Sequence, residues 1–328
     1  MTKKKALILG ATGQDGSYMI DLLLKKKYEV HGLYRKSSVG NTNNIDHLIA
    51  DNKIFNKSFY LHKGDLLDTV SLHNIINDIN PKEIYNFADQ DHVGWSYEIP
   101  SYSFKTTALS VIEILEIIRK KNKKIKFFQP ISSNIFGETS ISKQNEKTHP
   151  EPNSIYALAK TTAFYASKMY TKVYNLHICG AIFFNHESPK RHRDYVSKKI
   201  VQNVCEILHG KRKHIYLGNI KSKIDWGYAK EYVEYSWKIM QRKKPEFYVI
   251  GTGKNNSVEY FVRKCFEYVG LNYKKFIKID KKLFRPSKTR NLLADTLKAK
   301  KDLNFKPKIE LDGLIKIMMD DELKKYDG

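Results

Sequence analysis

The chain has 328 residues, of which 41% are hydrophobic and 28% are charged, so it can bury a large core as one unit or two domains. No apolar run is long enough to cross a bilayer, which argues against a membrane protein. The lysine-rich start passes straight into a short strand-like segment, without the apolar region and cleavage site of a signal peptide. A cytoplasmic location is therefore expected.

The formal net charge of +23 raises the question of nucleic-acid binding. The basic residues are mostly lysine, scattered among Asn and Ile, and no aromatic and arginine recognition module accompanies them. A solvated lysine surface is the stronger interpretation, without a nucleic-acid partner, although such charge helps attract a polyphosphate ligand. Cys179, Cys205 and Cys265 lie far apart and predict reduced core residues. No spacing of His, Cys and Asp predicts a metal site.

Strand-like and helix-like segments alternate through the first half of the chain, as in a parallel α/β sheet. The predicted strands are residues 6–10, 29–34, 59–63, 83–88, 125–131 and 176–184. Helical patterns between them include residues 17–26 and 107–120. We therefore predict an α/β fold with a doubly wound parallel sheet of the Rossmann type over residues 1–184. The less regular pattern beyond it predicts a smaller α/β substrate domain, residues 185–328, interleaved with the first.

A glycine-rich loop follows the first predicted strand and opens the first predicted helix. Glycines permit a tight turn and a close approach of the backbone to a pyrophosphate, which then sits at the positive end of the helix. A glycine pattern alone is weak, but its position at the start of successive βα units makes it specific. The loop predicts that the dinucleotide is bound by Gly10, Thr12, Gly13, Gln14, Asp15 and Gly16.

The second predicted strand ends in a basic turn. NAD sites usually place an acid here for the ribose hydroxyls, whereas this chain has Arg35, Lys36 and Ser37, which complement a 2′-phosphate. The turn therefore predicts NADP as the cofactor, with a solvated basic turn as the alternative. Asp65 and Leu66 follow the third strand and are expected near the adenine, although a surface position for Asp65 fits nearly as well.

Tyr156 and Lys160 stand four residues apart, which puts both side chains on one face of a helix. The Lys160 ammonium can lower the pKa of the Tyr156 phenol, so that the phenolate accepts the proton of a sugar carbinol while a nicotinamide takes the hydride. Ser132, at the end of the preceding strand, would share the hydrogen bond to the carbinol oxygen. Tyr-x-x-x-Lys is common by chance, but combined with the glycine loop and the strand-end serine it is specific.

These residues resemble those of the extended short-chain dehydrogenases/reductases, and in particular the GDP-mannose 4,6-dehydratase family, over almost the whole chain. The matching segments are residues 13–18, 35–38, 64–66, 92–93, 96, 184–189, 217–219, 225–227 and 284–286. The resemblance implies that Asn185, Lys199 and Arg285 hold the nucleotide diphosphate and that Ser96 belongs to the substrate site. It also implies a homo-oligomer, dimer or tetramer, in which the segment after Arg35 reaches a neighbouring subunit.

Three of the residues within these segments have a second interpretation. A guanidinium suits phosphate, which agrees with the role implied for Arg285, and an arginine that caps a local turn is the alternative. His186 and Glu187 have side chains suited to chemistry, but a buried structural pair is the role we expect for them.

The chain departs from the family's pattern at the residue that removes the C5 proton. The family uses Thr-x-Glu at this strand end, and the two positions here are Ser132 and Asn134. Serine keeps the hydroxyl, but an amide cannot take a proton near neutral pH. Removing a positioned general base costs two to four orders of magnitude in rate, roughly 3–5 kcal/mol of barrier. The strand end is closer to that of 4-epimerases and 4-keto reductases, which need no C5 chemistry.

A second departure lies in residues 89–93, which read Asp-Gln-Asp-His-Val where the family has Ala-Gln-Ser-His-Val. Asp91 stands where a substrate-facing serine is expected, and it could be a relocated base, a ligand of a sugar hydroxyl or a loop residue. Ile224 and Lys288 replace a family Arg and Glu, and the loop before Phe284 is short. These changes weaken the assignment of GDP-mannose itself as the substrate.

The favoured hypothesis is an NADP-dependent enzyme that transfers a hydride at C4 of a nucleotide sugar of the GDP-hexose type. Epimerisation at C4, or reduction or oxidation there without dehydration, is the expected outcome, with Asn134 contacting the sugar but taking no proton. The alternative is a GDP-mannose 4,6-dehydratase that uses Asp91 or a water as its base. A non-catalytic nucleotide-binding subunit is a remoter alternative, against which the intact Ser132, Tyr156 and Lys160 argue.

Overall fold

The computed structural model describes residues 3–284 and 292–326. The chain divides into two compact units of three segments each. Unit 1 contains Met1–Thr139, His149–Ile182 and Val233–Tyr248, and unit 2 contains Ser140–Thr148, Phe183–Tyr232 and Val249–Gly328. Arg285 and Lys288, which the sequence singled out, lie outside the described residues, so their predicted roles stay predictions.

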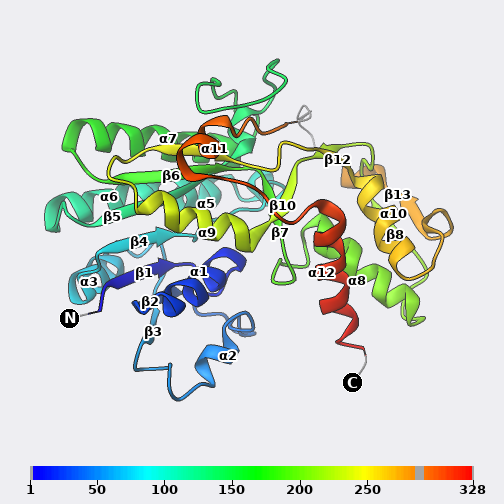
Figure 1. The fold of residues 1–328 in the computed structure, drawn as a ribbon, viewed down its shortest axis with the longest axis horizontal. Coiled ribbons are helices and arrows are strands. Elements are labelled where there is room, and N and C mark those ends of the chain that lie inside the picture. Colours follow the sequence, from blue (N-terminus) through cyan, green and yellow to red (C-terminus); the bar gives the residue numbers. More distant parts are fainter. Residues whose placement is uncertain (1–2, 285–291, 327–328) are drawn as a thin grey trace. The chain divides into compact units, whose positions relative to one another are not determined.

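A parallel sheet forms the centre of the first unit (Figure 1). Within the described residues this sheet has seven strands in the order β11-β6-β5-β4-β1-β2-β3. Their bounds are β1 (Lys5–Leu9), β2 (Glu29–Tyr34), β3 (Phe59–Lys63), β4 (Glu83–Asn86), β5 (Lys126–Ser132), β6 (Ile178–Phe183) and β11 (Phe247–Ile250). The pairs β1–β2, β2–β3, β1–β4 and β4–β5 are parallel. The predicted doubly wound sheet is confirmed, with β11 as a strand that the sequence pattern did not predict.

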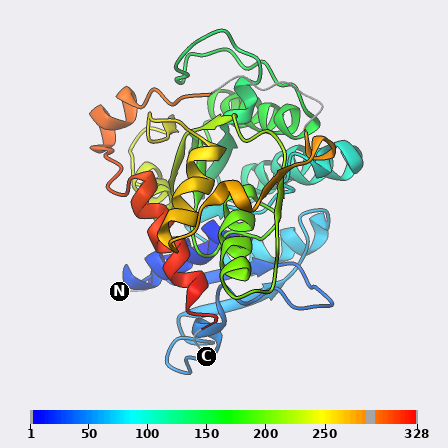
Figure 2. The same cartoon turned by 90° about the vertical axis from the view of Figure 1, so that its right-hand side faces the viewer.

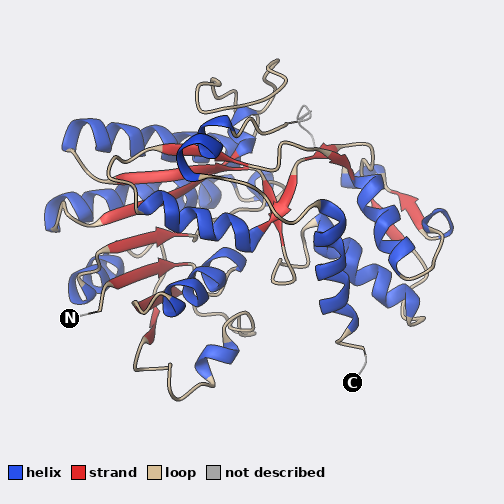
Figure 3. Ribbon diagram, in the orientation of Figure 1, coloured by secondary structure: helices blue, strands red, loops and turns tan. Residues whose placement is uncertain are grey.

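Burial explains why these short apolar segments become strands. Residues 6 to 9 of β1 are 0% exposed, so both faces of the strand are covered. A parallel strand buried on both faces reads as a continuous apolar run, as Ala-Leu-Ile-Leu does here. Helices flank the sheet (Figure 3), and they are α1 (Gln14–Lys25), α3 (Thr69–Ile79), α6 (Ser110–Lys121), α7 (Ile155–Tyr174) and α9 (Ala229–Met240).

The segment that precedes α6 is more irregular than the predicted helix 107–120. It contains the short helices α4 (Trp95–Glu98) and α5 (Pro100–Phe104), followed by a π-helical turn, Lys105–Leu109, that leads into α6. Two other short elements are α2 (Asp46–Ile49) and a 3-10 turn, Ser133–Phe136, directly after β5. A π turn inside a helix often marks a functional region. Here it brings Thr107 to the loop after β4, as described below.

In its described residues, the second unit combines helices with three two-stranded sheets. Helices α8 (Val196–Leu208), α10 (Val258–Tyr268) and α12 (Leu311–Leu323) pack around a shared apolar core that includes Val204, Phe261 and Met318 (Figure 2). The sheets pair β7 (Asn185–Glu187) with β10 (Trp226–Tyr228), β9 (Lys223–Ile224) with β12 (Asn256–Ser257), and β8 (Ile215–Leu217) with β13 (Ile277–Ile279). The unit also contains the shorter helix α11 (Leu297–Leu303) and two 3-10 turns, Tyr273–Lys275 and Lys281–Leu283.

Candidate active site

The glycine loop forms a bare backbone cradle between β1 and α1. Gly10 has φ +79°, a left-handed conformation that favours glycine, and Gly13 N donates to Gly10 O at 3.1 Å. Gly13 is the N-cap of α1, and no side chain caps the helix there. The first backbone N–H groups of a helix lack partners within it, and they carry the positive end of the helix dipole. This arrangement suits an anion.

The space inside the cradle excludes side chains at two of its glycines. A Cβ at Gly16 would lie 2.1 Å from Gly10 O, and a Cβ at Gly10 would lie 2.6 Å from Phe87 O in the chain beyond β4. The loop after β4 therefore touches the glycine loop, at the point where the strand order switches from β1 to β4. A dinucleotide pyrophosphate binds at such a switch point, and the cradle fits that group.

The other predicted residues of the loop have structural contacts of their own. Gln14 is buried, and its Nε2 donates to Asp15 Oδ1 at 3.2 Å. Thr12 O accepts a hydrogen bond from Asn44 Nδ2 at 3.0 Å, which ties the loop to the segment after β2. The structure thus places Thr12, Gln14 and Asp15 around the cradle, and their contact with a cofactor stays a prediction.

Arg35 and Lys36 are exposed directly after β2, and Ser37 is half-buried beside them. The Arg35 Nη1 donates to the Tyr102 hydroxyl at 2.7 Å, and Arg35 O accepts from Asn41. Tyr102 comes from α5, far along the chain, so no local pattern pointed to it. Its hydroxyl holds the guanidinium at the strand end where a 2′-phosphate would bind.

Asp65 and Leu66 lie after β3. Asp65 Oδ1 accepts the backbone N–H of Leu67 at 2.9 Å, so this carboxylate stabilises the local turn. Leu66 is buried, with 5% of its surface exposed. These contacts account for both residues structurally, and their proximity to an adenine stays a prediction.

Ser132, Tyr156 and Lys160 come from β5 and α7, two neighbouring elements of unit 1. Ser132 ends β5, whereas Tyr156 and Lys160 lie in the first turns of α7, which begins after its cap residue Ser154. Tyr156 is 6% exposed and Lys160 is 4% exposed, and the Lys160 Nζ lies 5.9 Å from the centre of the Tyr156 ring. The helix therefore brings an ammonium close to a buried phenol, as the spacing predicts.

Asn134 lies directly beyond Ser132 in the 3-10 turn. Its backbone N–H and its side-chain Nδ2 donate to Ser132 Oγ at 3.2 and 2.9 Å. A hydroxyl offers two acceptor lone pairs and one proton. Because Asn134 engages both lone pairs, the Ser132 proton is left for donation to another oxygen. The amide that stands at the predicted base position therefore makes Ser132 a hydrogen-bond donor.

A carboxylate that the sequence did not single out, Asp89, forms an ion pair with Lys160. The Lys160 Nζ also donates to Pro130 O at 3.0 Å, and the two charged side chains are only 5% and 14% exposed. Burial raises the pKa of the Asp89 carboxyl, the Lys160 charge opposes that rise, and Asp91 and Asp15 add to it. The sequence could have pointed to Asp89 only through its position directly after β4, the strand next to β1 and the glycine loop.

Asp91 and Ser96 lie further along the same segment. Asp91 is exposed, as a residue that meets a substrate can be. Ser96 is 0% exposed, and its Oγ donates to Val93 O at 2.7 Å, so its hydroxyl stabilises the chain before α4. The roles predicted for both residues in substrate binding or catalysis stay predictions.

The predicted substrate residues of unit 2 lie on β7 and α8. Asn185 is exposed on β7, whereas Lys199 is half-buried and its Nζ donates to Tyr216 O at 3.0 Å. Burial lowers the pKa of Lys199, and the Arg212 charge adds to that shift. Arg285 lies outside the described residues. The structure leaves the role of this set in diphosphate binding as a prediction.

His186 and Glu187, next to Asn185, have structural surroundings. The His186 ring stacks on Tyr232 with the ring centres 4.8 Å apart. Glu187 is 2% exposed, accepts from Ser197 Oγ at 2.6 Å and forms an ion pair with Arg191. These contacts account for both side chains structurally, and the structural role expected for them stays a prediction.

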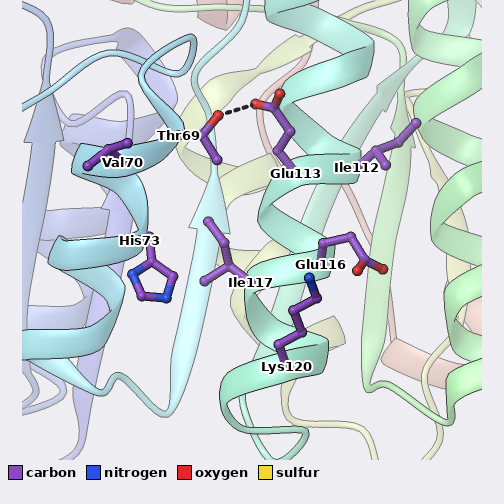
Figure 4. Close-up of a pocket in the computed structure, with 8 residues that line it drawn as sticks. All are labelled: Thr69, Val70, His73, Ile112, Glu113, Glu116, Ile117 and Lys120. Carbon is purple, nitrogen blue, oxygen red and sulfur yellow. Dashed lines mark hydrogen bonds between the residues drawn. The ribbon is translucent and has the colours of Figure 1, made fainter.

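A hollow of about 420 Å³ lies apart from these residues, between α3 and α6 (Figure 4). It is lined by Thr69, Val70, His73, Ile112, Glu113, Glu116, Ile117 and Lys120. None of these belongs to the candidate active site, so the hollow plays no part in the chemistry considered below. In residues 3–284 and 292–326, no group of three or more His, Cys, Asp or Glu side chains is placed to hold a metal. No helix of the described chain is long and apolar enough to span a membrane.

The site combines a phenol, an ammonium and a strand-end hydroxyl beside a glycine cradle. Together with the seven-stranded parallel sheet, this combination defines a class of protein. The class is that of the short-chain dehydrogenases/reductases, in their extended form. Two solved structures share the fold over nearly the full chain. A UDP-glucose 4-epimerase from Thermotoga maritima, solved with UDP-glucose, is 22% identical with a TM-score of 0.84 and covers 98% of this chain and 99% of its own. A dTDP-glucose 4,6-dehydratase from Bacillus anthracis, solved with NAD, is 21% identical with the same TM-score, 0.84, and covers 99% and 98%.

Sequence comparison narrows the class to one family. The family model for GDP-mannose 4,6 dehydratase matches residues 7–318. GDP-mannose 4,6 dehydratase 1 of Arabidopsis thaliana is 42% identical over 327 residues, which are 98% of this chain and 90% of the relative. The chain therefore belongs to the GDP-mannose 4,6-dehydratase family, as its motifs predict. The two solved structures, an epimerase and a dehydratase, resemble it equally, so the fold does not distinguish their reactions.

Proposed function

We propose that this chain is an NADP-dependent 4,6-dehydratase of a GDP-linked hexose. The observation that carries the proposal is the 42% identity to a protein of that name across 98% of the chain. The half-buried Ser132 and the buried Tyr156 and Lys160 supply the groups that the first step needs. This relationship favours the dehydratase alternative over the reaction confined to C4, which Asn134 alone had favoured.

In this proposal the chain's own residues handle the protons of the reaction. Tyr156 takes the proton of the sugar C4 hydroxyl, and Ser132 donates a hydrogen bond to the C4 oxygen. The chemistry that a bound NADP supplies is the acceptance of a hydride from C4 and its return to C6. Oxidation at C4 acidifies the C5 hydrogen. Its removal as a proton expels the C6 hydroxyl, which takes up a proton and leaves as water, and C5 takes a proton from solvent when the hydride is returned to C6. The product is a 6-deoxy-4-keto sugar.

We assign the removal of the C5 proton to Asp91, with a bound water as the alternative. An amide at residue 134 cannot accept this proton near neutral pH. Asp91 is an exposed carboxylate that follows β4, the strand between β1 and β5. The carboxyl ends of these parallel strands share one edge of the sheet, and Ser132 ends β5 at that edge. Asp91 can therefore approach a sugar bound to Ser132.

The choice of NADP rests on the end of β2. Arg35 and Lys36 place two cations where a 2′-phosphate would lie, and the 2.7 Å bond to Tyr102 orients the Arg35 guanidinium. In unit 2 the exposed Asn185 and the cationic Lys199 would hold the nucleotide diphosphate, together with Arg285. A cytoplasmic location is part of the same proposal.

A homo-oligomer is also part of this proposal. Four large side chains follow one another along the outer side of α7 and are 44% to 61% exposed, namely Leu158, Tyr165, Met169 and Val173. Exposed apolar side chains gathered on one helix are typical of a contact surface, and a second copy of this chain is the partner that we propose. Light scattering on the wild type and on a Met169→Lys variant tests it, and an unchanged mass in the variant would contradict the role of α7.

One observation favours a second candidate, a reaction that stops at C4. Asn134 fills both acceptor sites of Ser132 with hydrogen bonds of 3.2 and 2.9 Å. A fixed hydroxyl donor polarises a C4 carbonyl, which helps a 4-keto reduction or an epimerisation and does nothing for the C5 proton. This candidate explains Asn134 more directly than the dehydratase does.

The mass of the product separates the two candidates. The enzyme is incubated with NADP and GDP-mannose, and the nucleotide sugars are analysed by mass spectrometry. The dehydratase predicts a product that is lighter than the substrate by one water. A product of unchanged mass that separates from GDP-mannose on chromatography, or one lighter by two hydrogens, would instead support chemistry confined to C4.

A further inference from the structure

The ion pair between Asp89 and Lys160 joins two stretches of unit 1 inside the candidate active site. Asp89 follows β4, Lys160 lies on α7, and the ammonium is held on its other side by Pro130 O of β5 at 3.0 Å. The charged side chains are 14% and 5% exposed. Little water reaches this pair, so each charge acts strongly on its neighbours.

The fold holds the carboxylate in place. Gln90, the next residue, is 6% exposed and is bonded on several sides. Its backbone N–H donates to Thr107 Oγ1 at 3.3 Å, its side-chain Nε2 donates to His92 O at 3.1 Å, and its Oε1 accepts from Ser103 Oγ. Thr107 belongs to the π turn before α6. The hydrogen bonds of the buried Gln90 thus fix the position of the neighbouring Asp89.

The charges around the pair determine what it does to Tyr156. The Lys160 cation, 5.9 Å from the phenol ring, favours the phenolate. Asp89 offsets that cation, and the carboxylates of Asp91, in the same loop, and Asp15, at the start of α1, add negative charge. Asp89, in contact with Lys160, therefore acts against the effect of this cation on the phenol.

We propose that Asp89 is a positioning residue of the hydride-transfer site, which clamps the Lys160 ammonium against Pro130 O and offsets its charge, so that Tyr156 keeps its proton to higher pH. The proposed oxidation at C4 needs the phenolate of Tyr156, so Asp89 would determine the pH above which Tyr156 can take the proton of the C4 hydroxyl. The inference rests on the proposed role of Tyr156 as the acid/base group.

The test measures the ionisation of Tyr156 without any catalytic assay. The chain has 21 tyrosines, so tyrosinate absorbance is titrated in pairs of proteins that differ only by Tyr156→Phe, and the difference isolates Tyr156. The pairs are built on the wild type, on Asp89→Asn and on Glu98→Gln. Glu98 is an exposed carboxylate of α4, so its loss removes one negative charge from the same segment without touching Lys160.

We expect the Tyr156 midpoint in Asp89→Asn to move toward acid by about 1 pH unit, because an opposing charge beside Lys160 is lost. Glu98→Gln should leave the midpoint in place, and Asp89→Glu should return it toward the wild-type value. A midpoint in Asp89→Asn that is unchanged, or that moves toward alkaline pH, would overturn the inference.

A second variant guards against a folding defect. Thermal unfolding is followed for each protein, and if Asp89→Asn does not fold, Asp89→Ala is titrated in its place with the same expected shift. Alanine is the residue that the family's pattern has at this position. An enzyme without activity on any nucleotide sugar would contradict the proposed function, but it would leave the titration of Tyr156 readable.

Discussion

The glycine cradle after β1 and the corner around Lys160 lie at the same edge of one sheet, but they are built in different ways. The cradle is one continuous loop, and what it requires is space, because a Cβ at Gly16 would lie 2.1 Å from Gly10 O. The corner combines Asp89, Pro130 and Lys160 from three separate stretches, and what it requires is balanced charge. A local sequence motif is therefore sufficient to predict the glycine cradle, whereas the contacts around Lys160 form only when distant segments fold together.

This comparison predicts that substitutions near Lys160 mainly lower kcat, whereas substitutions in the glycine cradle mainly weaken NADP binding. Tyr156→Phe removes the acid/base group, so we expect a loss of two to four orders of magnitude in kcat with NADP affinity nearly unchanged. Steady-state kinetics and a fluorescence titration of NADP measure the two quantities. Tyr165→Phe on the same helix is the matched control. It removes a phenolic hydroxyl that lies outside the candidate active site and keeps the apolar ring, so it should leave kcat near the wild-type value. A small kcat loss in Tyr156→Phe would place the chemistry elsewhere.

Two glycines of the cradle separate its packing from its ligand contact. Gly16→Ala forces a Cβ to 2.1 Å from Gly10 O, so we expect a loss of about 2–4 kcal/mol in the free energy of unfolding. At Gly13 the nearest contact of a Cβ would be 3.4 Å, which is tolerable. Gly13→Ala should therefore change urea unfolding little and weaken NADP binding, since Gly13 opens the helix toward the anion. Equal destabilisation by both variants would contradict the geometry of the cradle.

Arg35 tests whether the end of β2 selects the cofactor. Arg35→Ala removes the charge-assisted bonds to a 2′-phosphate, so we expect the preference for NADP over NAD to fall by about tenfold to a hundredfold. Tyr102→Phe should weaken the same preference by less, because it removes only the hydroxyl that holds Arg35 at 2.7 Å. Affinities for both cofactors are measured in parallel. An equal loss for NADP and NAD would argue against recognition of the 2′-phosphate.

The smallest expected effect lies outside both regions, at His177 before β6. Burial, aided by the charge of Lys126, lowers the pKa of His177 to about 4 from 6.5. The unfolded chain then binds more protons than the folded one between about pH 4 and 6.5, so stability rises with pH across this window and is lost as the pH falls. Urea unfolding from pH 4.5 to 7 should show a shallower slope in His177→Gln. Burial lowers the pKa values of His31 and His62 as well, so part of the slope should remain.

The His177→Gln variant also provides a control for the titration of Tyr156, because the protonation of His177 should affect the stability of the fold and not the charges around Lys160. In His177→Gln the Tyr156 midpoint should stay at its wild-type value while the slope of stability with pH changes. A shift of the Tyr156 midpoint in this variant would mean that the two titrations are coupled.

Much of the first unit could be predicted from the chain alone. Six of the strands lie within two residues of the predicted ranges at each end, because buried parallel strands have continuous apolar runs. The strand β11, Phe247–Ile250, was missed because four apolar residues give no period and its partner β6 is far away in sequence. The π turn before α6 was missed for a related reason, since Thr107 is bonded to Gln90 across a distance that no local pattern records.

The candidate site divides in the same way. The sequence placed Ser132 at a strand end and Tyr156 with Lys160 on one helix, and the structure has them there. It could not show that Asp89 pairs with Lys160 or that Tyr102 holds Arg35, because each pair joins segments far apart in the chain. Spacing predicts which side chains share a helix face, but only the fold decides which charges meet.

The most direct test of the proposed function is proton NMR of the product formed from GDP-mannose and NADP in deuterated water, with the wild type and with Asp91→Asn. We predict a 6-deoxy-4-keto sugar that carries deuterium at C5 in the wild type, and a greatly reduced rate of its formation in Asp91→Asn. An intact C6 hydroxyl with C4 inverted or oxidised would contradict the dehydratase, and would mark Asn134 as the residue of an enzyme that stops at C4.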